Sequence, residues 1–267
     1  MTLRGVRSPP LTSSVGSPMA GHSKWKQIKR KKAVTDAKRG AKFTKLIKEI
    51  TIAARHGGGD PAGNARLRTA IDAAKAGNMP ADNIERAIKK GTGELEGVHY
   101  EEATYEGYGP GGAAIMIEVT TDNLNRTVAD LRHLFTKHGG NLGTTGSVAW
   151  MFDKKGQVSL DASTLGEDRV LEAALEAGAD DMTRDGDQFV ITTDPTVVHA
   201  VADALRAAGL DPEPAEIALI PTTTVMVAGH DAEKLLRLMD AIEDHDDVST
   251  VFSNFDLDAD TLAAVGG

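Results

Sequence analysis

The chain has 267 residues, of which 40% are hydrophobic and 26% charged, a composition typical of globular proteins. Its length predicts two domains or three small ones. Cysteine is absent, which excludes disulfides, thiolate nucleophiles and cysteine-ligated metals. No apolar run reaches the length of about 18 residues that a bilayer requires, and the N-terminus lacks the apolar centre of a secretory signal. We therefore expect a cytoplasmic protein that does not interact with membranes.

Charge is distributed unevenly along the chain. Residues 1–91 contain 20 Lys and Arg against 6 Asp and Glu, a net charge of +14. Residues 92–267 contain 10 against 33, a net charge of −23, so that the whole chain carries −9. Such an asymmetry indicates that the basic part binds nucleic acid, with the acidic remainder turned away from the phosphates.

The first segment, residues 1–18, combines Ser, Pro and Arg with no acidic residue and no hydrophobic periodicity. We expect a disordered extension that does not belong to the fold. Its composition is compatible with a transit peptide, but an extended start upstream of Met19 is the favoured interpretation.

A basic helical domain is predicted over residues 19–92. Apolar residues recur every three or four positions between residues 22 and 55 and indicate an amphipathic helix that ends at Gly57. The pair Asp60-Pro61 predicts the start of a second helix, and Pro80 the start of a third that ends at Gly91. Short connections between amphipathic helices favour a three-helix bundle.

From about residue 98 the hydrophobic period changes to two, which indicates a sheet. The pattern predicts a strand around residues 113–120, a helix over 124–138 and a strand at 148–152. Residues 154–220 then follow the order strand, helix, strand, strand, helix, strand of a complete ferredoxin-like module. The tail supplies a further strand, helix and strand between residues 223 and 252.

Two half-modules therefore flank one complete module. Because unpaired strands would leave open sheet edges, we expect the halves to pair with each other. The prediction is an α+β protein: an N-terminal three-helix domain followed by two ferredoxin-like domains, the second inserted in the first. The discontinuous domain comprises residues 93–153 and 221–267, and the inserted domain residues 154–220.

The strongest candidate for nucleic-acid contact is the basic segment of residues 21–45. Six Lys and Arg residues fall within the nine positions 24–32, with one tryptophan among them. Such cations contact backbone phosphates, and an aromatic ring can stack on an unpaired base. The alternative is a solvated basic face with Trp25 packed over Ile28. The candidate residues are His22, Lys24, Trp25, Lys26, Lys29, Arg30, Lys31, Lys32, Lys38, Arg39, Lys42 and Lys45.

Two further segments are candidates for contacts with ribose or phosphate. YEGYGPGG, residues 105–112, contains Tyr108 in a glycine-rich loop, which is read either as a structural turn or as a contact surface. It matches no nucleotide-binding fingerprint. TTDNLNR, residues 120–126, joins a strand to a helix and is read first as a helix N-cap and second as a phosphate site with Asn125 and Arg126.

No residue pattern points to catalysis. The eight histidines show no metal-ligand spacing, and the acidic runs have no counter-group for acid–base chemistry. We predict that the protein is not an enzyme and has no metal site and no cofactor. A remote alternative is a nucleotide-dependent enzyme that uses the loop of residues 105–112.

Five segments resemble the YebC family: MAGHSKWKQIKRKKAVTDAKR, NMPADNIERAIKKG, YEGYGPGG, EVTTDNLNRT and GSVAWMF. This family includes bacterial proteins labelled as transcriptional regulators and the mitochondrial translational activator of cytochrome oxidase subunit I. The resemblance extends from about residue 19 to the C-terminus. It implies three domains, one helical and two α/β.

The resemblance implies two competing roles: binding promoter DNA, and acting on ribosomes, including relief of stalling at proline-rich stretches. A basic domain without an evident recognition helix favours structured RNA over duplex DNA. We therefore favour a ribosome-associated translation factor that binds ribosomal RNA, with a DNA-binding transcriptional regulator as the alternative. The sequence leaves the oligomeric state open.

Overall fold

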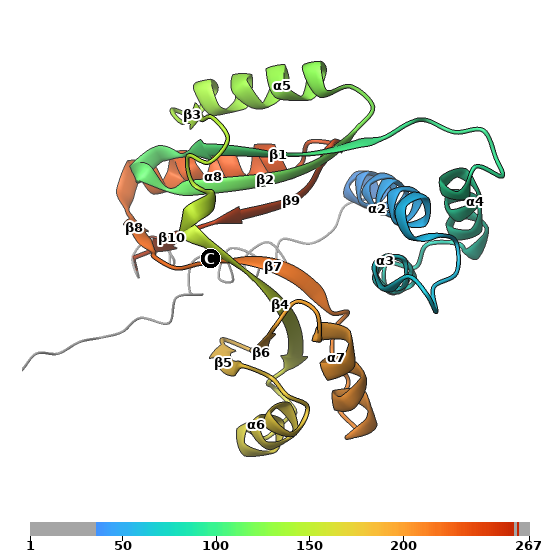
Figure 1. The fold of residues 1–267 in the computed structure, drawn as a ribbon. Helices are drawn as coiled ribbons and strands as arrows, with labels where there is room; N and C mark the ends of the chain where they lie inside the picture. Colours follow the sequence, from blue (N-terminus) through green and yellow to red (C-terminus); the bar gives the residue numbers. More distant parts are fainter. Residues whose placement is uncertain (1–35, 259–260, 262–267) are drawn as a thin grey trace, which may run out of the picture.

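The computed structural model describes residues 36–258 and residue 261, and Figure 1 shows their arrangement. A group of helices lies beside a sheet covered by two helices, and a second, smaller α+β unit lies below that sheet. The α+β class, with the helical part first and one α+β unit inserted in the other, is therefore confirmed. Within the described residues no helix is long and apolar enough to cross a membrane.

The helical domain consists of α2 (Asp36–Gly57), α3 (Ala65–Ala76) and α4 (Ala81–Thr92). One face of each helix buries aliphatic side chains in a common core, as the spacing of three and four predicts. This core contains Ile50, Leu67 and Ile84.

The start of the second helix was predicted incorrectly. Asp60 caps a separate turn, in which its carboxylate accepts a hydrogen bond from the backbone N–H of Ala62. The N-cap of α3 is Asn64, whose side-chain oxygen accepts from the N–H of Leu67 while its amide donates to the carbonyl of Ala53 in α2. Asn64 therefore performs two tasks, which an aspartate cap cannot do because it has no donor.

The discontinuous domain has a four-stranded sheet with the order β3-β1-β2-β9. Its strand β9 comes from the C-terminal part of the chain and pairs antiparallel with β2, so that the halves on either side of the inserted unit share one sheet. A two-stranded parallel pair of β8 and β10 adjoins it. The elements are β1 (Glu101–Tyr108), β2 (Ala114–Thr121), α5 (Leu124–Lys137), β3 (Asn141–Leu142), β8 (Val225–Val227), α8 (Gly229–Glu243), β9 (Val248–Ser253) and β10 (Phe255–Leu257).

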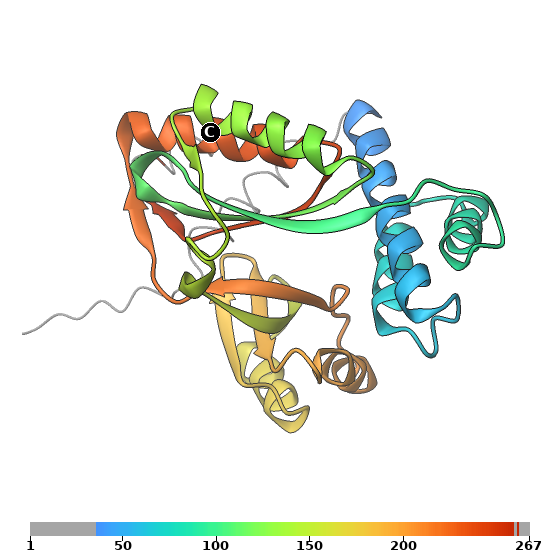
Figure 2. The same ribbon diagram turned by 45° about the horizontal axis from the view of Figure 1, so that its top comes forward.

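Helices α5 and α8 cover the same face of this sheet, as Figure 2 shows. Alternate residues of β2, including Ile115 and Ile117, meet Phe135 of α5 and Leu238 of α8 in one apolar core. This packing makes the sheet one-sided. Its other face is left for the inserted unit and for α2.

Two details of this domain differ from the prediction. Residues Tyr105 to Tyr108, expected in a loop, lie in β1, where three glutamates conceal the strand pattern. The strand expected at residues 148–152 is a short 3-10 helix, η2 (Ala149–Met151), followed by strand β4, which starts at Phe152. The break occurs because Glu106 accepts backbone N–H groups there that a strand would need for pairing.

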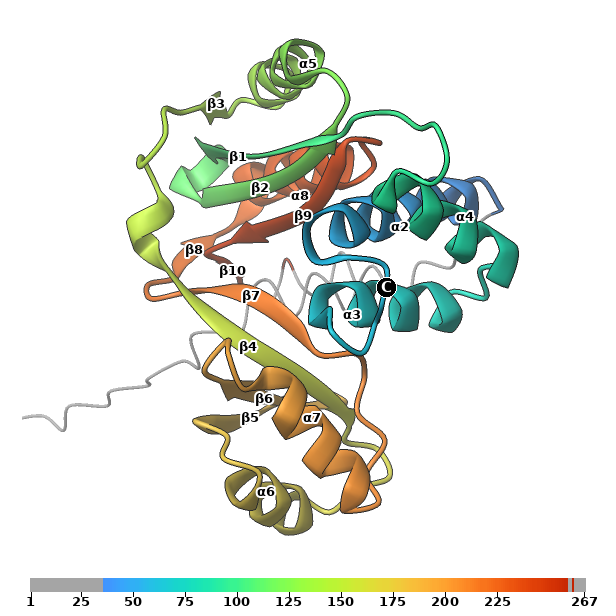
Figure 3. The ribbon, with the colours of Figure 1, turned by 45° about the vertical axis from the view of Figure 1, so that its right-hand side comes forward.

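The inserted unit contains β4 (Phe152–Asp161), α6 (Glu167–Glu176), β5 (Asp181–Asp185), β6 (Gln188–Thr193), α7 (Val198–Ala207) and β7 (Glu216–Pro221). Its sheet has the order β5-β6-β4-β7, which is the ferredoxin-like arrangement. The long strands β4 and β7 carry the chain into and out of the unit, as Figure 3 shows. A small apolar cluster with Met116, Phe152 and Phe252 packs the unit against the free face of the larger sheet.

Candidate nucleic-acid interface

The structure describes only part of the predicted contact surface. Lys38 and Arg39 lie in the first turns of α2, and Lys42 follows with an exposed side chain. The other candidates of the basic segment lie outside the described residues and stay predictions: His22, Lys24, Trp25, Lys26, Lys29, Arg30, Lys31 and Lys32.

Further along α2 the lysines turn from solvent to the discontinuous domain. The ammonium group of Lys45 donates a hydrogen bond of 2.5 Å to the carbonyl of Glu243 at the end of α8. Lys48, one turn later, is buried and reaches the carboxylate of Asp247 at 2.7 Å. Its ammonium also lies 5.7 Å from the centre of the Tyr100 ring. The same helix therefore has an exposed cation near its start and cations that hold another domain farther on.

Asp247 is the centre of this contact. Besides Lys48, its carboxylate accepts hydrogen bonds from Arg126 at 2.8 Å and from the hydroxyl of Thr127 at 2.8 Å. Burial alone would raise the pKa of Asp247, but these donors hold it well below the usual range of a carboxylic acid. Asp247 is therefore charged whenever the protein is folded near neutral pH.

Arg126, predicted to contact phosphate, is paired with carboxylates of the protein itself. The guanidinium pairs with both Asp122 and Asp247, which raises its pKa and compensates its charge. Asn123 is the N-cap of α5 and accepts from the N–H of Arg126, so the N-cap interpretation of this segment is confirmed. Asn125 is exposed in the first turn.

The surroundings of Arg126 are acidic. A polar cavity of about 580 Å³ opens beside it, lined from the ends of α5 and α8 by Asp122, Asp130, Asp244 and Asp246. Carboxylates in this number repel a phosphate group, because like charges at short range cost free energy. Lys45 therefore joins the helical domain to the discontinuous domain, whereas Arg126 pairs within the discontinuous domain, and the contact of both with nucleic acid stays a prediction.

Tyr108 lies at the other end of the sheet. It is the last residue of β1, opposite Ala114, whereas Arg126 follows the end of β2 that pairs with Glu101. An eight-residue strand is about 25 Å long, so the two predicted contacts cannot form one local site. The Tyr108 hydroxyl donates 2.9 Å to the carbonyl of Ser147.

The glycines near Tyr108 are explained by packing. A Cβ atom on Gly107 would lie 2.5 Å from the Phe135 ring, and one on Gly109 would lie 2.7 Å from Leu235. Gly111 and Gly112 adopt positive φ angles in the turn between β1 and β2. This supports the structural interpretation of the glycine-rich segment, in which small residues let α5 and α8 approach the sheet closely.

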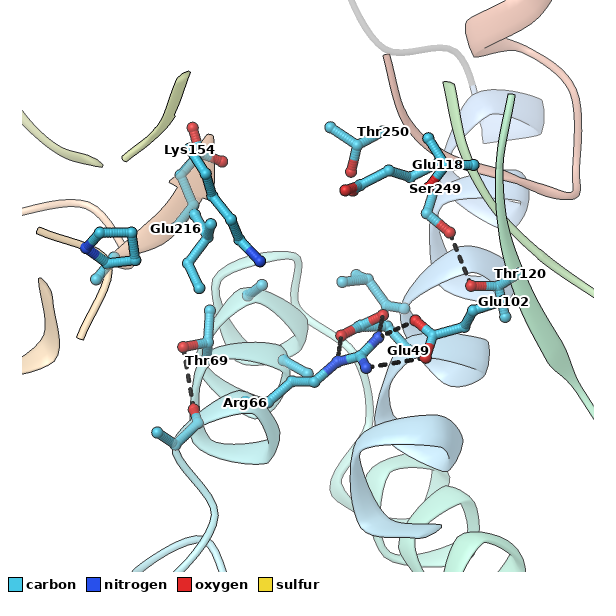
Figure 4. Close-up of a pocket in the computed structure, with 18 of the residues that line it drawn as sticks. Glu49, Arg66, Thr69, Glu102, Glu118, Thr120, Lys154, Glu216, Ser249 and Thr250 are labelled. Carbon is cyan, nitrogen blue, oxygen red and sulfur yellow. Dashed lines mark hydrogen bonds and ion pairs between the residues drawn. The ribbon is translucent and has the colours of Figure 1, made fainter. Parts of the chain in front are cut away.

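A large cavity of about 1000 Å³ lies between the helical domain, the larger sheet and the inserted unit, and Figure 4 shows its walls. Arg66 of α3 is held there between Glu49 and Glu102, which ties the helical domain to β1. Glu118 of β2 and Lys154 of β4 face the cavity from different domains. Burial raises the pKa of Glu118, and the nearby Lys154 partly offsets this. No pattern in the sequence indicates this cavity, because the residues that line it are far apart in the chain.

The fold and its charges define a modular protein in which a cation-rich helical domain is docked, through some of its cations, onto an acidic α+β body. The chain belongs to the TACO1/YebC family. A model of the TACO1/YebC N-terminal domain matches residues 23–94, and a model of the second and third domains matches residues 100–255.

Bacterial relatives match this chain over almost their full length. A "Probable transcriptional regulatory protein" of Gemmatimonas aurantiaca is 60% identical over 92% of this chain and 99% of its own. A protein of the same description from Acidithiobacillus ferrooxidans is 59% identical over 92% of this chain and 98% of its own. The crystal structure of a conserved hypothetical protein from Aquifex aeolicus has a TM-score of 0.78 and 48% identity, covering 84% of this chain and 92% of that one.

Proposed function

We propose that this protein is a nucleic-acid-binding regulator of gene expression that acts in the cytoplasm on structured RNA of the ribosome. The observation that carries the proposal is the segregation of charge, +14 in residues 1–91 and −23 in the rest. Of the positive charge, residues 36–91 contribute 12 cations against 6 acids, and several of these cations hold the acidic domains. The surplus therefore lies mainly in residues 1–35, which have 8 cations and no acid.

The helical domain supports RNA more than sequence-specific duplex DNA. A recognition helix reads bases with side chains of its first turns. The first turns of α4 expose Asp82 and Glu85, which the phosphates of a duplex would repel if this helix entered a major groove. On α3, Arg66 is engaged by two glutamates. The exposed acids of α4 and the engaged Arg66 of α3 disfavour base reading by these turns, whereas binding by shape and phosphate contacts needs only cations.

Transcription regulation is the second candidate, and one observation favours it. The relatives at 57–60% identity carry the description "Probable transcriptional regulatory protein". This role would use the same basic segment, but it requires preference for a particular duplex sequence.

We further propose that the protein acts by binding and without catalysis. The glycine-rich segment proposed for a nucleotide is occupied by strand β1 and its turn, with Phe135 and Leu235 against the glycines. Among the described residues no group of three or more His, Asp or Glu side chains is placed to hold a metal ion.

The salt dependence of binding tests the proposal. If residues 22–45 contact roughly six phosphates, log affinity for a ribosomal RNA fragment falls with log salt at a slope near −5. Changing Lys29, Arg30, Lys31 and Lys32 to alanine should reduce that slope by about 3 or more. The control removes four cations of the inserted unit, Lys155, Arg169, Arg184 and Arg206, and should leave the slope unchanged.

Two further measurements separate the roles. Sucrose-gradient sedimentation of cell extract at low salt should place the protein with ribosomal particles. Residence only in the soluble fraction after crosslinking would refute the ribosomal role. Retention of a promoter duplex well above random duplex would instead establish the transcriptional role.

A further inference from the structure

The acidic two-thirds of the chain contains one long segment without acidic residues. Between Asp130 and Asp153 there is no Asp or Glu, although residues 92–267 hold 33 of them. The segment includes Arg132, His133, Lys137 and His138, and therefore forms a locally basic strip. It covers the second half of α5, β3, and the loop that leads to η2.

The fold adds cations from α8 to this strip. Lys234 lies next to Gly139, at 4.0 Å from the position of a Cβ atom there. The pKa of His138 is lowered first by burial and then by the charges of Lys137 and Arg237, so that both cations lie near the His138 ring. Lys137 and Arg237 are exposed, and Arg237 faces Glu233 at 4.0 Å in an exposed pair that solvent screens.

The strip ends at an exposed tryptophan. Trp150 has 69% of its surface exposed, more than any other large hydrophobic side chain in the described part of the chain. Its indole Nε1 donates a hydrogen bond of 3.1 Å to the carbonyl of Ser147. The only polar atom of the ring is thus satisfied by the protein, and the ring is held in place with apolar surface toward solvent.

The loop that carries Trp150 is rigidly anchored. The buried carboxylate of Glu106 accepts hydrogen bonds from the N–H groups of Gly146, Val148 and Ala149, at 2.6, 2.7 and 2.9 Å. A fixed aromatic ring loses little conformational freedom when a ligand stacks on it. The fold therefore holds Trp150 in an exposed position, and its exposure does not result from a loose loop.

Contacts connect the cations to the tryptophan. Lys234 lies against Gly139, the next residue Gly140 lies against the backbone of Tyr108, and Tyr108 shares the Ser147 carbonyl with Trp150. Figure 3 shows the chain passing from α5 through β3 to β4 along the edge of the sheet where β1 ends and β2 begins. The cations and the ring thus lie along one continuous edge.

We infer that this edge is a second nucleic-acid contact, which binds an unpaired nucleotide segment by stacking a base on Trp150 and placing phosphates against Lys137, Lys234 and Arg237. The inference rests on the proposed function and gives it a second contact point outside the N-terminal basic segment. A patch that is basic within an acidic body is complementary to phosphate, and a free aromatic face is complementary to an unpaired base. A duplex, whose bases are already stacked, cannot use the tryptophan.

Trp150 fluorescence tests the stacking directly. In full-length protein with Trp25→Phe, Trp150 is the remaining tryptophan. Titration with an oligoadenylate RNA of about 12 nucleotides, a length within the usual single-strand site sizes, should quench its emission at saturation. The same sequence as DNA should also quench the emission, because the inferred contact uses only a base and phosphates. A matched duplex, and heparin, which has charge but no bases, should not.

Substitutions in otherwise wild-type protein provide the second test. Trp150→Ala should weaken binding of the oligonucleotide about fivefold or more, whereas Trp150→Phe should retain most of the affinity. Removing Lys137, Lys234 and Arg237 together should reduce the salt slope by about 2. Removing Arg169, Arg184 and Arg206 from the inserted unit makes the same change in net charge and should have no such effect.

The outcomes separate this inference from the proposed function. Binding that is strong by anisotropy but neither quenches Trp150 nor responds to Trp150→Ala overturns the inference and leaves the proposed function standing. Absence of any binding to RNA or DNA overturns both. If a protein ligand quenches Trp150 emission and no oligonucleotide does so, the edge is a protein-binding surface. This result would also refute the inference.

Discussion

Single carboxylates in this protein have structural roles that depend on burial. Glu106 is 5% exposed, and its two oxygens satisfy three backbone N–H groups where the chain leaves the larger sheet for the inserted unit. Burial alone would raise the pKa of Glu106, but these hydrogen bonds lower it. A charged acceptor here replaces the strand pairing that residues 146–149 lack.

Glu106→Gln should destabilise the protein by about 2–3 kcal/mol. The amide keeps the volume but has one acceptor oxygen, and its NH2 group would face backbone donors. The measurement is the urea midpoint at pH 7, and Glu101→Gln, an exposed change on the same strand, is the control. Equal midpoints for the two variants would contradict the role assigned to Glu106.

At the scale of elements, helix packing depends on glycine where two backbones approach. In α4, a Cβ atom on Gly91 would lie 2.4 Å from the carbonyl oxygen of Thr51 in α2. Gly40 near the start of α2 has nothing within 4 Å. Both glycines are helical, but only the first is required by a neighbour.

Gly91→Ala should therefore destabilise the helical domain by about 1–3 kcal/mol, because either α2 or α4 must move. Gly40→Ala is the matched control and should stabilise by up to about 1 kcal/mol through helix propensity. Thermal unfolding followed by circular dichroism measures both. A loss of stability at Gly40 equal to that at Gly91 would show that close approach is not the cause.

At the scale of the whole molecule, the cluster around Asp247 links the helical domain to the discontinuous domain. Lys48 reaches across from α2 to Asp247, and Arg126 reaches the same carboxylate from α5. The side chains of Asp247 and Lys48 are 5% and 10% exposed. Loss of one partner would leave the other charge buried, which is costly even where the intact pair contributes little net stability.

Asp247→Asn should reduce stability by about 3–5 kcal/mol at pH 7. Because the pKa of Asp247 is lowered in the folded state, its stabilisation is complete above the pKa of an unfolded aspartate and is lost as pH falls through the lower folded value. The difference between wild type and variant should thus shrink below about pH 4.

Urea unfolding at several pH values measures this. Asp122→Asn, at an exposed pair with the same arginine, should cost about 1 kcal/mol or less. A wild-type advantage that is constant from pH 7 to pH 3 would contradict the assignment.

Local pattern predicted the elements best where one face of a helix or strand is consistently apolar. This is why α5, α8 and the inserted unit were found from the sequence. It failed for β1, whose glutamates at positions 101, 102 and 106 conceal the strand, and for the start of α3, where Asn64 is chosen by contacts with α2. For the candidate site, the sequence identified the cations but not their partners.

The sequence by itself determined the class of fold, the family and the separation of a basic from an acidic part, because composition and short-range periodicity are properties of the chain before it folds. Only the tertiary structure decided which cations pair with carboxylates, as Lys48 does between domains and Arg126 within one domain, and which face solvent, as Lys137 does. It also brought α8 beside the acid-free segment and exposed Trp150. Such pairings join residues up to 199 positions apart, and no local pattern encodes a contact over that separation.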